Sequence, residues 1–357
     1  MAYLYEILML RVMFMLVTST SHHSPHSHVI MSESNIVENE VRTMDPLTHA
    51  IVGMALGAQS GGGVSLANGA LMAAALGAVA PDLDVVAQFW GDLAYLKQHR
   101  GFSHSLPGLT GIALVVGGLL SPFYHDVFFL NLVGWAFVGG FSHTILDLFN
   151  SYGVQIFWPF SRKMYTASLL MIFDPILMTL CFTAIILGAR GVKSPWLGGI
   201  FVIYLGVRWV MRMWATHLVK KRLSRHYHEI KVVTMPSLNS LFKWDFIARV
   251  PGRNIVGSVD LLRKRLKILR RLHYIKEDMK KILVNSCLGR HFQQFTPFFH
   301  VFYEKHEDKV IGRFMDLRYY VKDRFLHNGM IVMNEDLDVE EAVFQPYSLS
   351  RRVYLSD

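Results

Sequence analysis

Long apolar runs constrain this chain more than any other feature of its sequence. Two short runs rich in glycine and alanine, 48–59 and 66–80, predict a tight helical hairpin. Four later runs are each as long as the roughly 20 residues that a helix needs to cross a bilayer. These four runs are 104–124, 128–149, 167–189 and 195–217. We therefore expect a mainly α-helical protein with five to six membrane helices.

Composition agrees with a membrane protein that also has a soluble part. The chain is 52% hydrophobic, has a mean hydropathy of +0.29, and is 18% charged, below the roughly 25% of ordinary soluble domains. It has only two cysteines, Cys181 in an apolar run and Cys287 far from it. Neither a disulfide framework nor a cysteine zinc site is therefore indicated. Any metal must be held by histidines and carboxylates.

The charge distribution predicts the orientation in the membrane. Between positions 218 and 282 there are 17 Lys or Arg and 5 Asp or Glu. This basic segment begins immediately after the last apolar run, at Lys220 and Lys221. By the positive-inside rule, the C-terminal part is then cytoplasmic. We expect a multi-pass protein of the inner (plasma) membrane.

The chain divides into three parts. Residues 1–43 do not fit the membrane plan, because Glu6 and Arg11 interrupt the apolar start and a polar, aperiodic stretch follows. We interpret them as a disordered or spurious extension. The membrane domain is expected at 44–217. The part at 218–357 alternates apolar and polar residues between turns, which predicts a small cytosolic, basic α+β domain with an antiparallel sheet.

Histidines and aspartates recur in five short motifs along the apolar region. In "MDPLTHA" and "GGFSHTILDLFNSYG", a His and an Asp stand four residues apart, so each pair shares one face of its helix. The other motifs are "APDLDVV", "HRGFSHS" and "FDPIL". The five motifs supply the candidate metal ligands Asp45, His49, Asp82, Asp84, His104, His143, Asp147 and Asp174, with His99 as a further histidine.

These motifs predict one polar site. With a cytoplasmic C-terminus, every motif falls at or near the same cytoplasmic end of its helix. Ionisable groups at membrane depth are costly unless they are paired, metal-bound or hydrated, so such a cluster indicates function. Imidazole and carboxylate together suit zinc, manganese or iron. We expect one to three divalent ions, zinc first and manganese second, with His99 or Asp84 as general acid or base and Arg100 holding a substrate phosphate or carboxylate.

Four of the five motifs, taken alone, also have a purely structural interpretation, whereas His143 with Asp147 is harder to explain in this way. Asp45 and His49 could form a helix N-cap pair, and Asp82 with Asp84 could be a polar loop. The pair His99 and Arg100 could be a basic flank of a membrane helix. Asp174 could cap a helix that restarts at Pro175. The coincidence of all the motifs at one membrane face favours the functional interpretation.

As a set, the motifs "MDPLTHAIVGMALG", "APDLD", "HRGFSHS", "HTILDLFNSYG" and "FDP" resemble the membrane-bound metal-dependent hydrolases, a family of LexA-binding inner-membrane hydrolases, and especially its Bacillus-like form. The likeness is strong from Met44 to about 217. Later stretches, "FKWDFIARVPG" and "RFMDLRYY", are also similar to that subgroup. The resemblance implies a helical membrane protein with hydrolase activity that depends on a divalent metal.

The predicted function is therefore hydrolysis by metal-activated water, on a phosphoester or lipid-linked substrate at the cytoplasmic face. One alternative is a transporter of divalent cations or protons, because ionisable residues in membrane helices also mark ion paths. Another is a non-catalytic membrane anchor for the basic domain. The expected partners are membrane lipids, with anionic head groups at the basic segment. No specific nucleic acid is expected, since no recognition motif accompanies the basic run.

Overall fold

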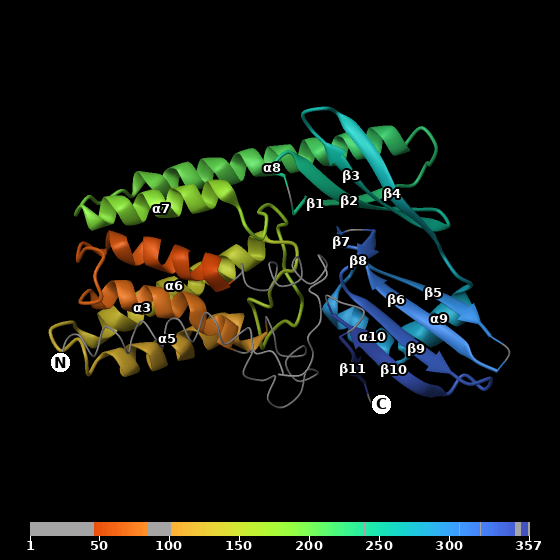
Figure 1. Ribbon diagram of the computed structural model, residues 1–357, viewed down its shortest axis with the longest axis horizontal. Helices are drawn as coiled ribbons and strands as arrows, with labels where there is room; N and C mark the ends of the chain where they lie inside the picture. The colour runs from red at the N-terminus through yellow and green to blue at the C-terminus, as the bar shows by residue number, and fades with distance from the viewer. Residues whose placement is uncertain are drawn as a thin grey trace, which may run out of the picture. The chain divides into compact units, whose positions relative to one another are not determined.

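The chain forms two compact units, residues Met1–Arg208 and Trp209–Asp357. The division falls inside a helix, α8, which contributes to both units (Figure 1). The computed structural model describes residues 46–83, 101–238, 240–306, 308–321, 323–346 and 351–355. The N-terminal stretch 1–43 lies outside the described residues.

The first unit is built from helices that coincide with the apolar runs. Residues 46–57 are helical and continue into the short 3-10 helix η2 (Ala58–Ser60). The expected helix at 167–189 begins only at Pro175, because the Asp174 side chain caps the first turn and proline is favoured there. The remaining elements are α3 (Gly69–Val79), η4 (Phe102–His104), α5 (Leu106–Leu120), α6 (Phe129–Phe149), α7 (Pro175–Ala189) and α8 (Trp196–Leu223).

Two of the described helices, α6 and α8, are long and apolar enough to cross a membrane. At about 1.5 Å per residue, the 15 residues of α5 and of α7 reach only about 22 Å, short of the roughly 30 Å hydrocarbon core. The five to six spans expected from sequence are thus not confirmed. The first unit nevertheless exposes many apolar side chains, among them Val115 and Leu119 on α5 and Val202 and Ile203 on α8.

Glycines bring α3 and α6 into backbone contact. A Cβ atom on Gly77 would lie 2.1 Å from the Ala136 carbonyl oxygen, and one on Gly139 would lie 2.1 Å from that of Ala74. Both distances are far inside van der Waals contact, so only glycine allows this approach. The almost wholly buried, alanine-rich α3 thereby packs directly on α6, which also packs on α5 (Figure 1).

The second unit begins with the C-terminal part of α8 and a four-stranded antiparallel sheet. The strand order is β1-β2-β3-β4, so β4 is an edge strand among the described residues. Ala215, Val219 and Leu223 of α8 form one stripe and pack on the sheet against Trp244 and Phe246. The strands are β1 (Lys231–Pro236), β2 (Lys243–Val250), β3 (Arg253–Asp260) and β4 (Arg265–His273).

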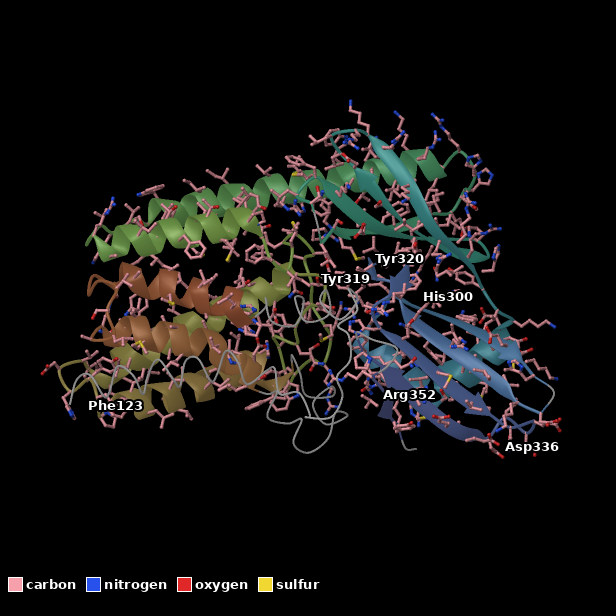
Figure 2. All side chains as sticks on the ribbon, in the orientation of Figure 1. Phe123, His300, Tyr319, Tyr320, Asp336 and Arg352 are labelled. Atoms are coloured by element: carbon pink, nitrogen blue, oxygen red, sulfur yellow. The ribbon has the colours of Figure 1, made fainter. Side chains whose placement is uncertain are left out.

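The opposite face of this sheet packs on a C-terminal α/β subdomain. Met235 and Ile247 from the sheet form a core with Leu317 and Phe325. His300 and Tyr320, labelled in Figure 2, belong to the side of the subdomain that meets this sheet. The subdomain has a five-stranded antiparallel sheet in the order β11-β10-β9-β6-β5 and a small β7-β8 ribbon. Its elements are α9 (Glu277–Asn285), α10 (Cys287–Phe295), β5 (Phe299–Lys305), β6 (Val310–Asp316), β7 (Tyr320–Val321), β8 (Arg324–Phe325), β9 (Asn328–Met333), β10 (Val339–Gln345) and β11 (Val353–Tyr354).

Candidate metal centre

Five of the predicted ligands converge in the helical unit. His143 and Asp147 lie in the last two turns of α6, and His104 ends η4 just before α5. Asp82 follows α3, and His49 belongs to the helix at 46–57. Their ligand atoms form two overlapping groups, one of His49, His143 and Asp147 and one of Asp82, His104 and His143, with all atoms of a group within 4.8 Å of one another.

The orientation of His143 is set by the contact between α3 and α6. Its Nδ1 lies 2.7 Å from the carbonyl oxygen of Ala78. A carbonyl only accepts hydrogen bonds, so Nδ1 carries the proton, and in the neutral ring the Nε2 lone pair faces the cluster. Metal-binding histidines commonly have this arrangement, with the other ring nitrogen donating to a carbonyl or carboxylate. Close helix packing thus prepares Nε2 as a ligand.

Two histidines and two aspartates in this cluster have ligand atoms at distances typical of a metal site. His104 Nε2 lies 3.1 Å from His143 Nε2 and 3.5 Å from Asp147 Oδ2, and the two histidine nitrogens lie 3.6 and 3.4 Å from Asp82 Oδ1. His143 Nε2 is 3.9 Å from Asp147 Oδ2. Ligands about 2.0–2.1 Å from a zinc ion stand about 3.3 Å apart at the corners of a tetrahedron. The donor set and its spacing therefore fit a divalent metal.

The second oxygen of Asp147 extends the cluster toward His49. Asp147 Oδ1 accepts a hydrogen bond from the Asn150 amide at 2.9 Å and lies 3.7 Å from His49 Nε2. The His49 ring stacks on His143 with centroids 3.6 Å apart. Both groups of ligand atoms include His143, and one imidazole nitrogen binds only one ion. The cluster is therefore either a single metal centre with His49 beside it, or two adjacent sites that are linked by the Asp147 carboxylate.

A small cavity adjoins this side of the cluster. Its volume of about 20 Å³ has room for about one water molecule. The polar part of its wall is formed by Thr48, His49, Asp147 and Asn150. The apolar part comes from Leu146, Leu177 and the segment 170–172. The cavity could therefore hold a water molecule next to a carboxylate and an imidazole.

Asp174 has a different role from the clustered residues. It is buried, and its Oδ1 accepts the backbone N–H groups of Ile176 and Leu177. The hydroxyl of Tyr204 on α8 donates to the same carboxylate at 2.8–2.9 Å. Neither convergent group of ligand atoms among the described residues includes Asp174. The structure thus gives this aspartate the helix-capping environment that was one of its two interpretations.

Four other predicted site residues cannot be placed: Asp45, Asp84, His99 and Arg100 lie outside the described residues. Conversely, sequence reasoning missed several neighbours of the cluster. Ser103 Oγ lies 2.9 Å from His104 Nδ1, and Thr144 Oγ1 donates to the His104 carbonyl at 3.2 Å. Asn150 stands three residues after Asp147, a spacing that brings side chains together near a helix end and could have indicated it. The Ala78 carbonyl leaves no signal in the sequence.

Fold and site together define a class: helical proteins with a buried His/Asp cluster compatible with a divalent metal, joined here to a C-terminal α/β domain. The comparison with known families makes this specific. Residues 44–215 match the model of the YdjM inner membrane protein family. Residues 283–352 match the YfhP C-terminal alpha/beta plait domain, which agrees with the antiparallel five-stranded sheet and its helices. The family expected from the sequence motifs is thereby confirmed.

A relative in Bacillus subtilis (strain 168), named "Uncharacterized protein YfhP", extends the similarity to both units. It is 26% identical over 332 residues, which cover 87% of this chain and 99% of the relative. No solved structure matches the chain. The similarity to this relative thus includes the helical unit, α8 and the C-terminal sheets together.

Proposed function

We propose that this protein is a membrane-bound metal-dependent hydrolase whose divalent metal, zinc or manganese, is held by His104, His143, Asp82 and Asp147. One observation carries the proposal: the two histidine nitrogens lie 3.1 Å from each other and 3.4–3.9 Å from one oxygen of each aspartate, close to the separation of two ligands of one zinc ion. The match of residues 44–215 to an inner membrane protein family supports the location.

The residues around the proposed metal site have different roles. When bound, such an ion supplies Lewis-acid activation of water and of an ester oxygen at neutral pH. Asn150 fixes one oxygen of Asp147, so the other oxygen stays aimed at the two histidines. His49, close to Asp147 and bordering the water-sized cavity, is placed to accept a proton there. His99 or Asp84 as acid or base, and Arg100 as phosphate holder, remain predictions from the sequence.

The proposed substrate is a phosphoester or a lipid-linked ester at the cytoplasmic face of the membrane. The ligands lie at the C-terminal end of α6 and the N-terminal end of α5, so the centre is at one end of the helices and not at their middle. The opposite end carries Phe123, labelled in Figure 2. A site at a helix end can be reached from the head-group region, where ester groups of lipids are found.

Elemental analysis of the full-length, detergent-purified protein tests the proposal first. We expect stoichiometric zinc or manganese in the unaltered protein and its loss in the double variant His104→Ala/Asp147→Ala, together with loss of metal-dependent hydrolysis of phosphoesters. The matched control is His125→Ala, which removes an exposed histidine of the loop after α5. Metal retained in the folded double variant, or absent from the folded unaltered protein, would overturn the proposed function.

A further inference from the structure

One end of the four-stranded sheet exposes apolar side chains. Leu262, in the turn between β3 and β4, is 69% exposed, and Phe242, just before β2, is 43% exposed. The two are neighbours, because the Leu261 amide donates to the Phe242 carbonyl at 3.0 Å. Large apolar residues at the tip of a sheet need a partner if they are not to face water.

Cations surround this tip. Residues 261–276 contain no acidic side chain. Asp260, directly before this stretch, accepts the backbone N–H of Arg263 at 3.0 Å and so closes the turn. The exposed cations around the tip are Lys243, Arg263, Lys264, Arg265 and Lys267. We call Phe242, Leu262 and these five cations the basic tip.

Contacts with α8 show which way the basic tip points. The chain leaves α8 at Leu223 and begins β1 at Lys231. Thr234 of β1 then lies back along the helix: its Oγ1 is 2.7 Å from Thr216 Oγ1, and its carbonyl accepts Arg212 Nε at 3.2 Å. Seven helical residues and three strand residues both cover about 10 Å, so β1 retraces α8 toward its N-terminal half.

The basic tip continues in that direction. β1 ends at Pro236, which pairs with Trp244 at the start of β2, and Trp244 pairs with Val259 near the end of β3. The tip therefore lies at the end of the sheet nearer the apolar part of α8. That part of the helix exposes Trp209, Val210, Met213 and Trp214.

We infer that the basic tip docks on the anionic head-group region of the bilayer that α8 crosses, with Leu262 and Phe242 inserted among the lipids. Exposed apolar side chains beside Lys and Arg are typical of interfacial membrane contacts, and each such cation near an anionic surface contributes about 1 kcal/mol. Tryptophans on α8 at the same level fit the aromatic belt at a membrane interface. The inference rests on α8 being a membrane span and not on the hydrolase activity.

Depth measurement in nanodiscs tests the inference on the full chain. Cys181 and Cys287 are replaced by alanine, and an environment-sensitive dye is attached at Leu262→Cys. In discs with phosphatidylglycerol, we expect blue-shifted emission that is quenched by head-group nitroxide lipids. The matched control is the same dye at His273→Cys, the exposed far end of strand β4, where neither change is expected. Equal, unquenched emission at both positions would overturn the inference.

A charge-reversal variant provides the second part of the test. Arg263→Glu/Lys264→Glu should reduce the preference of the tip for phosphatidylglycerol over phosphatidylcholine discs, by about fivefold for each cation removed. An unchanged preference would contradict an electrostatic contact. A duplex oligonucleotide added to the discs distinguishes the other partner of a basic surface. If the dye emission responds to the duplex and not to lipid composition, the partner of the basic tip is nucleic acid and not lipid, and the inference is overturned.

Discussion

At the scale of single residues, the two buried aspartates of the helical unit, Asp147 and Asp174, are of different kinds. Asp147 has one oxygen directed at histidine nitrogens and the other held by Asn150. Asp174 accepts only hydrogen-bond donors that a helix start and a neighbouring tyrosine provide. In the sequence, an aspartate in an apolar run next to a proline has the same pattern whether it binds a metal or caps a helix. The partners distinguish them.

Substitutions at Asp174 should therefore affect stability and leave the metal bound. Asp174→Ala removes an N-cap worth about 0.5–2 kcal/mol and the acceptor of the Tyr204 hydroxyl, so the melting temperature should fall. Asp174→Asn keeps a capping oxygen and should melt close to the unaltered protein. Metal content, measured on both folded variants, should not change; a folded Asp174→Asn protein without metal would make this residue a ligand.

The sequence could identify the clustered histidines and aspartates, but not the backbone contacts that orient their side chains. His143 and Asp147 stand four apart in an otherwise uncharged run, which is costly without a function. Their convergence with His104 follows from motifs at matching helix ends. The proton on His143 Nδ1, in contrast, depends on the backbone of a helix 65 residues earlier. No pattern of side chains encodes such a contact.

At the scale of elements, the α3–α6 contact positions the centre. Gly139 is one turn before His143, so a side chain at this position would push α6 away from the Ala78 carbonyl. Gly139→Ala should lower thermal stability by a few kcal/mol and reduce metal content, because backbone cannot move aside cheaply. Gly134→Ala on the same helix is the control, since its Cβ would meet nothing within 4 Å. Equal melting and equal metal in the two variants would contradict this role.

The apolar runs predicted the positions of the helices well, but they did not predict which helices are long enough to cross a membrane. The expected run 128–149 became α6 almost residue for residue, whereas the run 167–189 lost its first turns to the Asp174 cap. Hydropathy alone does not distinguish a spanning helix from a short one that packs inside the unit. In the second unit, the turn sequence "PGRN" at 251–254 joins β2 to β3, which pair as an antiparallel hairpin.

At the scale of the whole molecule, the second unit should lose stability in acid. Burial lowers the pKa of His327 and of His300 to about 4 in the second unit. Unfolded histidines titrate near 6.5, so the unfolded state binds more protons between these values, and stability falls as the pH drops from about 6.5 to 4. The loss is on the order of 2–3 kcal/mol for each histidine.

Calorimetry of the full chain in detergent checks this pH dependence. The melting transition of the second unit should shift downward steadily from pH 7 to pH 5. His327→Phe keeps an aromatic ring against Phe295 and Phe344 but cannot titrate, so it should flatten the shift. A slope that is identical with and without the imidazole would show that other groups control the acid response.

The position of β4 at the edge of its sheet has a consequence for solubility. An edge strand offers unpaired backbone groups to any other strand, and lysine and arginine side chains on such an edge discourage that pairing. Arg265, Lys267, Arg270 and Arg271 give β4 this protection along its whole length. Two of these cations, Arg265 and Lys267, also belong to the basic tip. The cations of β4 thus keep newly made copies of the chain from adding strand to strand, and alanines in their place should favour aggregation where glutamates would not.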